Sequence, residues 1–176
     1  MTDPVSSQKI SLYTPEQRRR RDATRWTLVQ GILAPLQFLV FIVSLLLVVN
    51  FLSTGEGLAA ATWSVICKTA VLYTIMVTGA IWEKKVFGQY LFAPAFYWED
   101  VVSMLVIALH TAYLVAWLFA LASPVTQMTI ALAAYAVYVV NAAQFLVKLR
   151  RARLEASGPQ ATPPQSSSPP LQLVQS

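Results

Sequence analysis

The sequence predicts an all-α, polytopic membrane protein with four transmembrane helices. Hydrophobic residues make up 56% of the 176-residue chain and charged residues only 12%, whereas about a quarter of the residues in a typical soluble domain are charged. Four apolar stretches are long enough to cross a hydrocarbon core, which takes about 20 helical residues. The short alternating segments of a β-barrel do not occur, so helices that satisfy their own backbone hydrogen bonds are expected.

The four spans are predicted at 27–52, 59–81, 101–121 and 127–147. The first and last contain no charged side chain, the second contains Lys68, and the third contains His110. Together they form a four-helix transmembrane domain at 27–150. A polar, basic segment precedes this domain at 1–26. A tail rich in Pro, Ser and Gln follows at 151–176, and its composition predicts disorder.

Lysine and arginine are distributed unevenly over the connections. They occur in the leading segment, in the connection between the second and third spans, and in the tail, but not in the two outer turns. Positive residues are retained on the cytoplasmic side, so both termini and the central connection are predicted to be cytoplasmic. The run Arg18–Arg21 therefore indicates contact with anionic lipid rather than nucleic acid.

Two local patterns add detail. Thr14, followed by Pro15 and Gln17, is typical of a helix N-cap, so a short basic helix is expected before the first span. Cys67 is the only cysteine. It allows no intrachain disulfide and no paired metal motif, and no metal site is predicted.

The connection from Trp82 to Asp100, WEKKVFGQYLFAPAFYWED, is the most informative segment. It holds seven aromatic rings, three carboxylates and two lysines. This composition indicates a binding surface for a flat, apolar and partly charged molecule, such as a tetrapyrrole. The alternative is an interfacial aromatic belt with solvated surface ion pairs.

The polar residues inside the spans each allow functional interpretations and a structural one. Lys68 lies near mid-membrane, where it either pairs with a substrate carboxylate or relays protons, or only positions its helix. His110 follows Glu99 by eleven residues, which places both on nearly the same face of a helix. It is either an acid or base, or an axial ligand of a substrate magnesium, or a hydrogen-bonded structural residue. A polar row on the fourth span is expected to form interhelical hydrogen bonds: Tyr135, Tyr138, Asn141 and Gln144.

The chain resembles the 3-vinyl bacteriochlorophyllide hydratase family. The resemblance covers about residues 11–153 and rests on long, unusual strings such as IWEK, VFGQYLFAPAF and WEDV. It implies a multi-pass enzyme of the bacterial inner membrane in bacteriochlorophyll biosynthesis, which adds water to the C3 vinyl group of a magnesium tetrapyrrole to give a 1-hydroxyethyl group. Other enzymes of that pathway are possible partners. No redox cofactor is required, and the resemblance carries no catalytic residue set.

Hydration of a vinyl group needs an acid, a base and a flat slot. We expect Glu99 or Asp100 to protonate the terminal carbon, and Glu83 or His110 to orient or deprotonate the water. The other predicted substrate contacts are the macrocycle-facing rings and the cations near the propionate: Phe92, Phe96, Tyr97, Trp98, Lys84, Lys85 and Lys68. Two other functions stay open at this point, a non-catalytic pigment carrier or assembly protein and a small channel.

Overall fold

The computed structural model describes residues 12–157, which form five α-helices and no strand. The helices are α1 (Pro15–Ala23), α2 (Arg25–Thr54), α3 (Leu58–Phe87), α4 (Tyr97–Leu118) and α5 (Pro124–Ser157). Four of them, α2 to α5, are long and apolar enough to cross a membrane. The all-helical prediction with four candidate spans is thereby confirmed.

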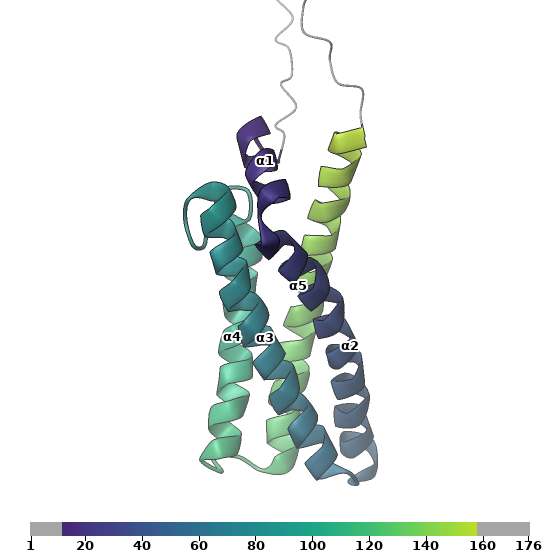
Figure 1. The fold of residues 1–176 in the computed structure, drawn as a ribbon. Coiled ribbons are helices and arrows are strands. Elements are labelled where there is room, and N and C mark those ends of the chain that lie inside the picture. The colour runs from purple at the N-terminus through teal and green to yellow at the C-terminus, as the bar shows by residue number, and fades with distance from the viewer. Residues whose placement is uncertain (1–11, 158–176) are drawn as a thin grey trace, which may run out of the picture.

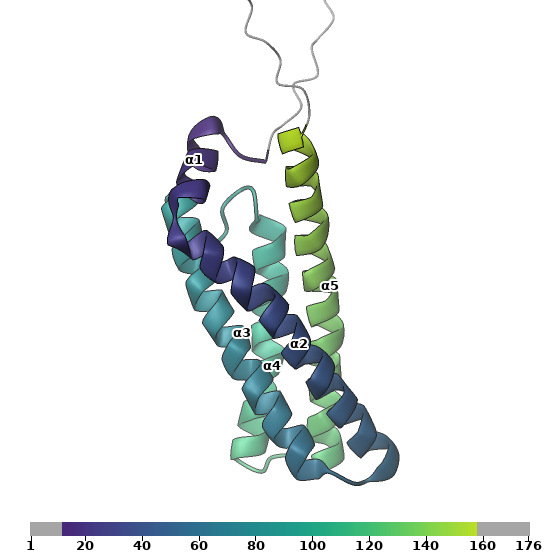
Figure 2. The ribbon, with the colours of Figure 1, turned by 45° about the vertical axis from the view of Figure 1, so that its right-hand side comes forward.

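The four long helices run up and down as two hairpins, α2–α3 and α4–α5 (Figure 1). Both hairpin turns lie at one end of the bundle. At the other end lie α1, the α3–α4 connection and the end of α5, as Figures 1 and 2 both show. We call this the rim end. It gathers the segments in which the sequence concentrates its charged residues.

Helix α1 begins where the capping pattern predicts. The Thr14 side chain accepts a hydrogen bond from the Gln17 backbone N–H, and the Gln17 side chain accepts one from the Thr14 N–H. Such reciprocal bonds satisfy donors that the first turn of a helix leaves free. The elbow between α1 and α2 is tied to α3, because Trp82 Nε1 donates to Thr27 Oγ1 at 2.9 Å.

Glycines with a left-handed backbone conformation flank α3 at both of its ends. Gly55 closes α2 with φ 79°, and Gly57 precedes α3 with φ 82°. Gly88 ends α3 with φ 90°, and its N–H donates to the Lys84 carbonyl. Only glycine adopts these φ values without steric cost, so the short turn and the start of the rim connection are fixed by the sequence.

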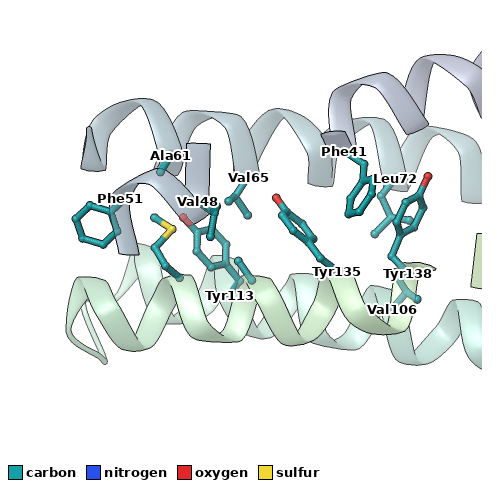
Figure 3. Packing of buried hydrophobic residues seen from close by; sticks show 12 residues of the cluster. Phe41, Val48, Phe51, Ala61, Val65, Leu72, Val106, Tyr113, Tyr135 and Tyr138 are labelled. Atoms are coloured by element: carbon teal, nitrogen blue, oxygen red, sulfur yellow. The ribbon is translucent and has the colours of Figure 1, made fainter. Parts of the chain in front are cut away.

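The main core lies along the bundle axis and is rich in tyrosine. Tyr135 and Tyr138 of α5 point across to Phe41 of α2 and Leu72 of α3 (Figure 3). The Phe41 ring lies 5.4 Å from the Tyr135 ring and 4.9 Å from the Tyr138 ring, measured between centroids. The outward faces instead expose large apolar side chains, which suits a lipid environment. On α2 these include Leu28, Ile32, Leu39 and Leu46.

The helices differ from the predicted spans mostly by extending further, but α4 ends earlier, at Leu118 and not at 121. Helix α5 continues through residues 151–157, which the sequence assigned to the disordered tail; the rest of that tail lies outside the described residues. Likewise α3 includes residues 82–87 and α4 begins at Tyr97, so only residues 88–96 form the connection at the rim. The 30 residues of α3 span about 45 Å at 1.5 Å per residue, which exceeds a hydrocarbon core of about 30 Å.

Candidate active site

Two carboxyl groups meet beneath the rim connection. Glu83, in the last turns of α3, and Asp100, in the first turn of α4, lie within interaction distance of each other. They are only 5% and 3% exposed. Two carboxylates are both acceptors, so a hydrogen bond between them requires one proton. Two neighbouring buried carboxyl groups disfavour two charges side by side, so a single shared proton would make the pair an acid beside its conjugate base.

The rim connection supplies backbone donors to this pair. The Phe92 N–H donates to Asp100 Oδ2 at 2.7 Å, and the next N–H, of Ala93, donates to Glu83 Oε2 at 3.3 Å. Phe92 has φ 59°, a left-handed conformation that is uncommon for a residue other than glycine. The turn continues with a 2.7 Å bond from the Phe96 N–H to the Ala93 carbonyl. Consecutive peptides of one loop thus hold carboxyls from two helices.

The neighbouring acid, Glu99, has a different partner. Its Oε2 lies 2.5 Å from Lys148 Nζ of α5. The ammonium group also donates to the Ala95 carbonyl and lies 4.8 Å from the centre of the Phe96 ring. The carboxylate of Glu99 is thus occupied by the ammonium group of α5, whereas Asp100 and Glu83 have no cation bonded to them among the described residues. The sequence predicted either Glu99 or Asp100 as the acid and Glu83 or His110 as the base; the structure brings Asp100 and Glu83 together and pairs Glu99 with Lys148.

The aromatic residues of the connection divide into two groups. Phe96 points inward into a cluster that we call the inner aromatic cluster. It lies 5.6 Å from Trp82, 5.7 Å from Phe87 and 6.1 Å from Phe145, between ring centroids. Tyr13 stacks on Phe87 at 5.8 Å in the same cluster. This packing fixes the base of the connection, and it leaves Phe96 with little exposed surface for a pigment.

The second group is exposed at the rim, and we call it the rim patch: Phe92, Tyr97 and Trp98. These side chains are 39%, 47% and 70% exposed. The Phe92 ring lies 5.8 Å from Tyr97, which lies 5.5 Å from Trp98. Tyr97 precedes Asp100 by three residues and so lies on the same side of α4. The patch therefore adjoins the acid pair.

The two lysines of the connection also differ. Lys84 Nζ donates to the Gly88 carbonyl at 2.7 Å and lies 5.3 Å from the Tyr90 ring centroid, so it helps to end α3. Lys85 lines an open depression of about 450 Å³ at the α1–α2 elbow. Arg20 and Arg25 share that depression. Lys85, unlike Lys84, therefore lies among other cations, a setting that suits an anionic ligand.

Lys68 and His110 lie deep in the bundle, away from the acid pair. Both are fully buried. Lys68 Nζ lies 3.9 Å from the centre of the Tyr138 ring, and His110 Nδ1 donates to the Val106 carbonyl at 2.8 Å. Among the described residues, neither Lys68 Nζ nor His110 Nε2 has a hydrogen-bond partner. His110 follows Asp100 by ten residues, which is about 15 Å along α4.

The polar row of α5 forms the predicted interhelical bonds at two positions. Tyr135 shares a 2.5 Å hydrogen bond with Ser44 of α2, and Asn141 Nδ2 donates to Ser103 Oγ of α4 at 2.9 Å. Their role is structural here, since each bond ties α5 to a neighbouring helix.

The structure therefore brings together Glu83, Asp100 and the rim patch, but it separates them from Lys68 and His110. Sequence reasoning missed Lys148, which it counted only as a charge that sets topology. A signal was present, because Lys148 follows Gln144 by one turn and so continues the polar row of α5.

Comparison with known proteins bears on this site. Residues 13–151 match the family described as 2-vinyl bacteriochlorophyllide hydratase (BCHF). The chain is 69% identical over 160 residues to the 2-vinyl bacteriochlorophyllide hydratase of Cereibacter sphaeroides, covering 90% of this chain and 98% of the relative. It is 68% identical over 159 residues to the protein of the same name from Rhodobacter capsulatus, covering 90% and 92%. No solved structure matches the chain significantly.

Proposed function

The chain belongs to the 2-vinyl bacteriochlorophyllide hydratase family, and from that premise we propose that its Glu83–Asp100 pair hydrates the vinyl group of a bacteriochlorophyllide. The protein is a hydratase of bacteriochlorophyll biosynthesis. The vinyl-bearing position, numbered 2 in the family description, corresponds to position 3 in the current numbering of tetrapyrroles. The product is the 1-hydroxyethyl derivative.

The observation that carries this assignment is the pair of neighbouring, nearly buried carboxyl groups, each of which accepts a backbone N–H from the same connection. Hydration of an alkene begins when an acid protonates the terminal carbon, which becomes a methyl group. The cation that remains on the inner carbon is delocalised into the macrocycle. A base must then take a proton from the water that attacks this carbon. An acid and a carboxylate held side by side supply both groups within reach of adjacent carbon atoms.

The pair also resets itself without an external proton. One carboxyl gives its proton to the alkene, and the other accepts a proton from the attacking water. The accepted proton then crosses the hydrogen bond between the two groups and restores the starting state. The sum of the steps is alkene plus water to alcohol, so neither a net proton nor an oxidant is consumed.

The rim patch is placed to contact the macrocycle. Its rings are exposed, Tyr97 contacts both Phe92 and Trp98, and the backbone of Phe92 bonds to Asp100. Stacking on a flat conjugated ring suits aromatic side chains. Because Glu83 and Asp100 are nearly buried, side chains of the connection must shift when the vinyl group enters. In this proposal Lys85 binds the propionate of the substrate with Arg25, and with Arg20, which also pairs with Glu16.

We further propose that the rim end lies in the cytoplasm and that the helices cross the inner membrane of a phototrophic bacterium. The charge asymmetry supports this orientation, since Lys84, Lys85 and the basic segments of α1 and α5 all lie at the rim end. The basic residues of α1 would then meet anionic lipid headgroups. A cytoplasmic active site also gives the reaction access to water and to soluble or membrane-bound enzymes of the same pathway.

The reaction is tested by expressing the chain in a host that lacks the pathway and supplying the vinyl pigment to its membranes. The expected result is a product heavier by one water, with a blue-shifted red absorption band. The double variant Glu83→Gln/Asp100→Asn should bind the pigment without converting it. Glu56→Gln, which changes an exposed carboxylate in the turn at the opposite end, is the matched control and should convert it normally. Pigment binding without conversion by the unmodified chain would instead identify a carrier.

A further inference from the structure

The peptide at Phe92 combines two features that are unusual together. Its residue is a phenylalanine with φ 59°, and its N–H forms the shorter of the two backbone bonds to the acid pair, at 2.7 Å to Asp100 Oδ2. A left-handed conformation is unfavourable for an aromatic residue and persists only where surrounding structure imposes it. Here the conformation directs the Phe92 N–H of the connection toward the buried carboxyl group of Asp100 in α4.

The environment of the pair is asymmetric. Asp100 accepts the 2.7 Å bond from Phe92, whereas Glu83 accepts only a 3.3 Å bond from Ala93. The other charged groups that act on Asp100 are Glu83 of α3, Glu99 of α4 and Lys148 of α5. Glu99 is neutralised by its own ion pair with Lys148. A short bond from a backbone donor stabilises the charged form of a carboxyl group.

We propose that Phe92 is a positioning residue, whose backbone N–H fixes Asp100 as the carboxylate and thereby leaves the shared proton on Glu83. This inference rests on the proposed function, and it divides the roles within the pair. Glu83 donates the proton to the terminal carbon of the vinyl group. Asp100 accepts the proton of the attacking water and returns it to Glu83. The roles are set by a backbone conformation, not by the Phe92 ring.

A matched pair of substitutions separates the backbone from the ring. Phe92→Gly and Phe92→Val both remove the ring and both keep the N–H. Glycine tolerates φ 59°, whereas a β-branched residue strongly disfavours it. In Phe92→Val the N–H is expected to turn away from Asp100. As the pH is lowered, the pair then takes up its second proton at a higher pH than it does in the unmodified protein.

The readout is the pH dependence of kcat for hydration. The acid limb is the part of the profile in which kcat falls as the pH is lowered. In Phe92→Val the midpoint of this limb should move to a higher pH by about one unit, the size expected for the loss of a hydrogen bond to a charged group. In Phe92→Gly the limb should stay within about 0.3 pH unit of the unmodified protein, although KM rises with loss of the ring. A residue with only a packing role would lower the yield of folded protein in both variants and leave the limb in place. An unmoved limb in folded Phe92→Val overturns the proposal.

A second measurement needs no variant at that position. Infrared spectra of the protein with carboxyl-¹³C-labelled glutamate, or with labelled aspartate, locate the protonated carboxyl by its C=O stretch. The band should shift with labelled glutamate and be lost in Glu83→Gln. A band that shifts with labelled aspartate contradicts the assignment even if the hydratase is active. An inactive protein whose band follows glutamate would contradict the proposed reaction instead, so the two failures are distinguishable.

Discussion

The acid pair at the rim and the Lys68–His110 cluster at mid-bundle are both buried and polar, but they differ in their partners. Each rim carboxyl contacts the other and accepts a backbone N–H from the connection. In the described part of the chain, Lys68 Nζ and His110 Nε2 lack such partners. Both Lys68 and His110 attracted attention in the sequence because a polar residue inside a membrane is costly.

The difference shows that burial of an ionisable group does not by itself identify a reactive site. The rim groups are held at a defined distance by two helices and a strained loop, which is the arrangement that proton transfer needs. The Lys68 group rests on the ring of Tyr138, and His110 bonds to its own helix. We therefore expect substitutions of Glu83 and Asp100 to change the rate, and substitutions of Lys68 and its neighbours at mid-bundle to change stability.

The largest effect is expected for Glu83→Gln. The amide keeps the size of the side chain but has no acidic proton to give, so kcat should fall by about 10²- to 10⁴-fold, the range typical of a lost general acid. Pigment binding, measured by absorption titration in detergent, should change little. Glu56→Gln, at an exposed carboxylate in the turn at the opposite end of the bundle, is again the control. A kcat within tenfold of the unmodified protein would remove Glu83 from the reaction.

Lys148→Met should have the next largest effect, on stability. It leaves the nearly buried Glu99 without its cation, and loss of one partner from a buried ion pair costs about 3–5 kcal/mol. Lys148 is itself partly exposed, so we expect the free energy of unfolding to fall by about 2–3 kcal/mol. Denaturant titration in mixed micelles measures it.

The double variant Lys148→Met/Glu99→Gln checks the cause of that loss. Because it also removes the unpaired carboxylate, it should recover at least half of the lost stability. No recovery would show that Lys148 acts through its stem and its contact with Phe96, not through its charge.

Much of the fold could be predicted from the sequence, because four long apolar stretches leave few alternatives inside lipid. The capping residues of α1 and the glycines of the first turn also act locally, so their sequence signals suffice. The extent of α3 and α4 into the aromatic segment was not predicted. Hydropathy marks the apolar part of a helix, and these helices continue beyond it.

The site was predicted only in part. Glu83 and Asp100 were both candidates, but they are seventeen residues apart, and their contact depends on the path of the connection between them. That path includes a left-handed Phe92, which no residue preference indicates. The division of the aromatic residues into an inner cluster and a rim patch was also unpredictable, because it follows from where α4 begins.

Lys68→Met tests the mid-bundle side of the comparison. The substitution keeps a long, unbranched side chain and removes an ammonium group that lacks a hydrogen-bond partner. Removing a charge from mid-membrane is favourable by at least about 2.5 kcal/mol on insertion scales. Loss of the contact with Tyr138 offsets as much as about 2 kcal/mol of this gain. We expect a net stabilisation of about 1 kcal/mol, seen as a higher Tm in detergent, and a kcat within threefold of the unmodified protein.

Ser103→Ala should have the smallest effect. It tests whether a buried hydrogen bond between helices contributes to stability alone. Ser103 lies on the inner face of α4 between Glu99 and His110, and its hydroxyl accepts the 2.9 Å bond from Asn141. Interhelical hydrogen bonds in membrane proteins contribute about 0.6 kcal/mol on average, so the free energy of unfolding should fall by about that amount. Thr111→Val, which removes the exposed hydroxyl that bonds to Tyr73, is the matched control and should cost less.

Hydration should proceed at the normal rate in both variants, because neither hydroxyl contacts the acid pair. A hundredfold loss of kcat in Ser103→Ala alone would connect the mid-bundle cluster to the rim and end the distinction between them.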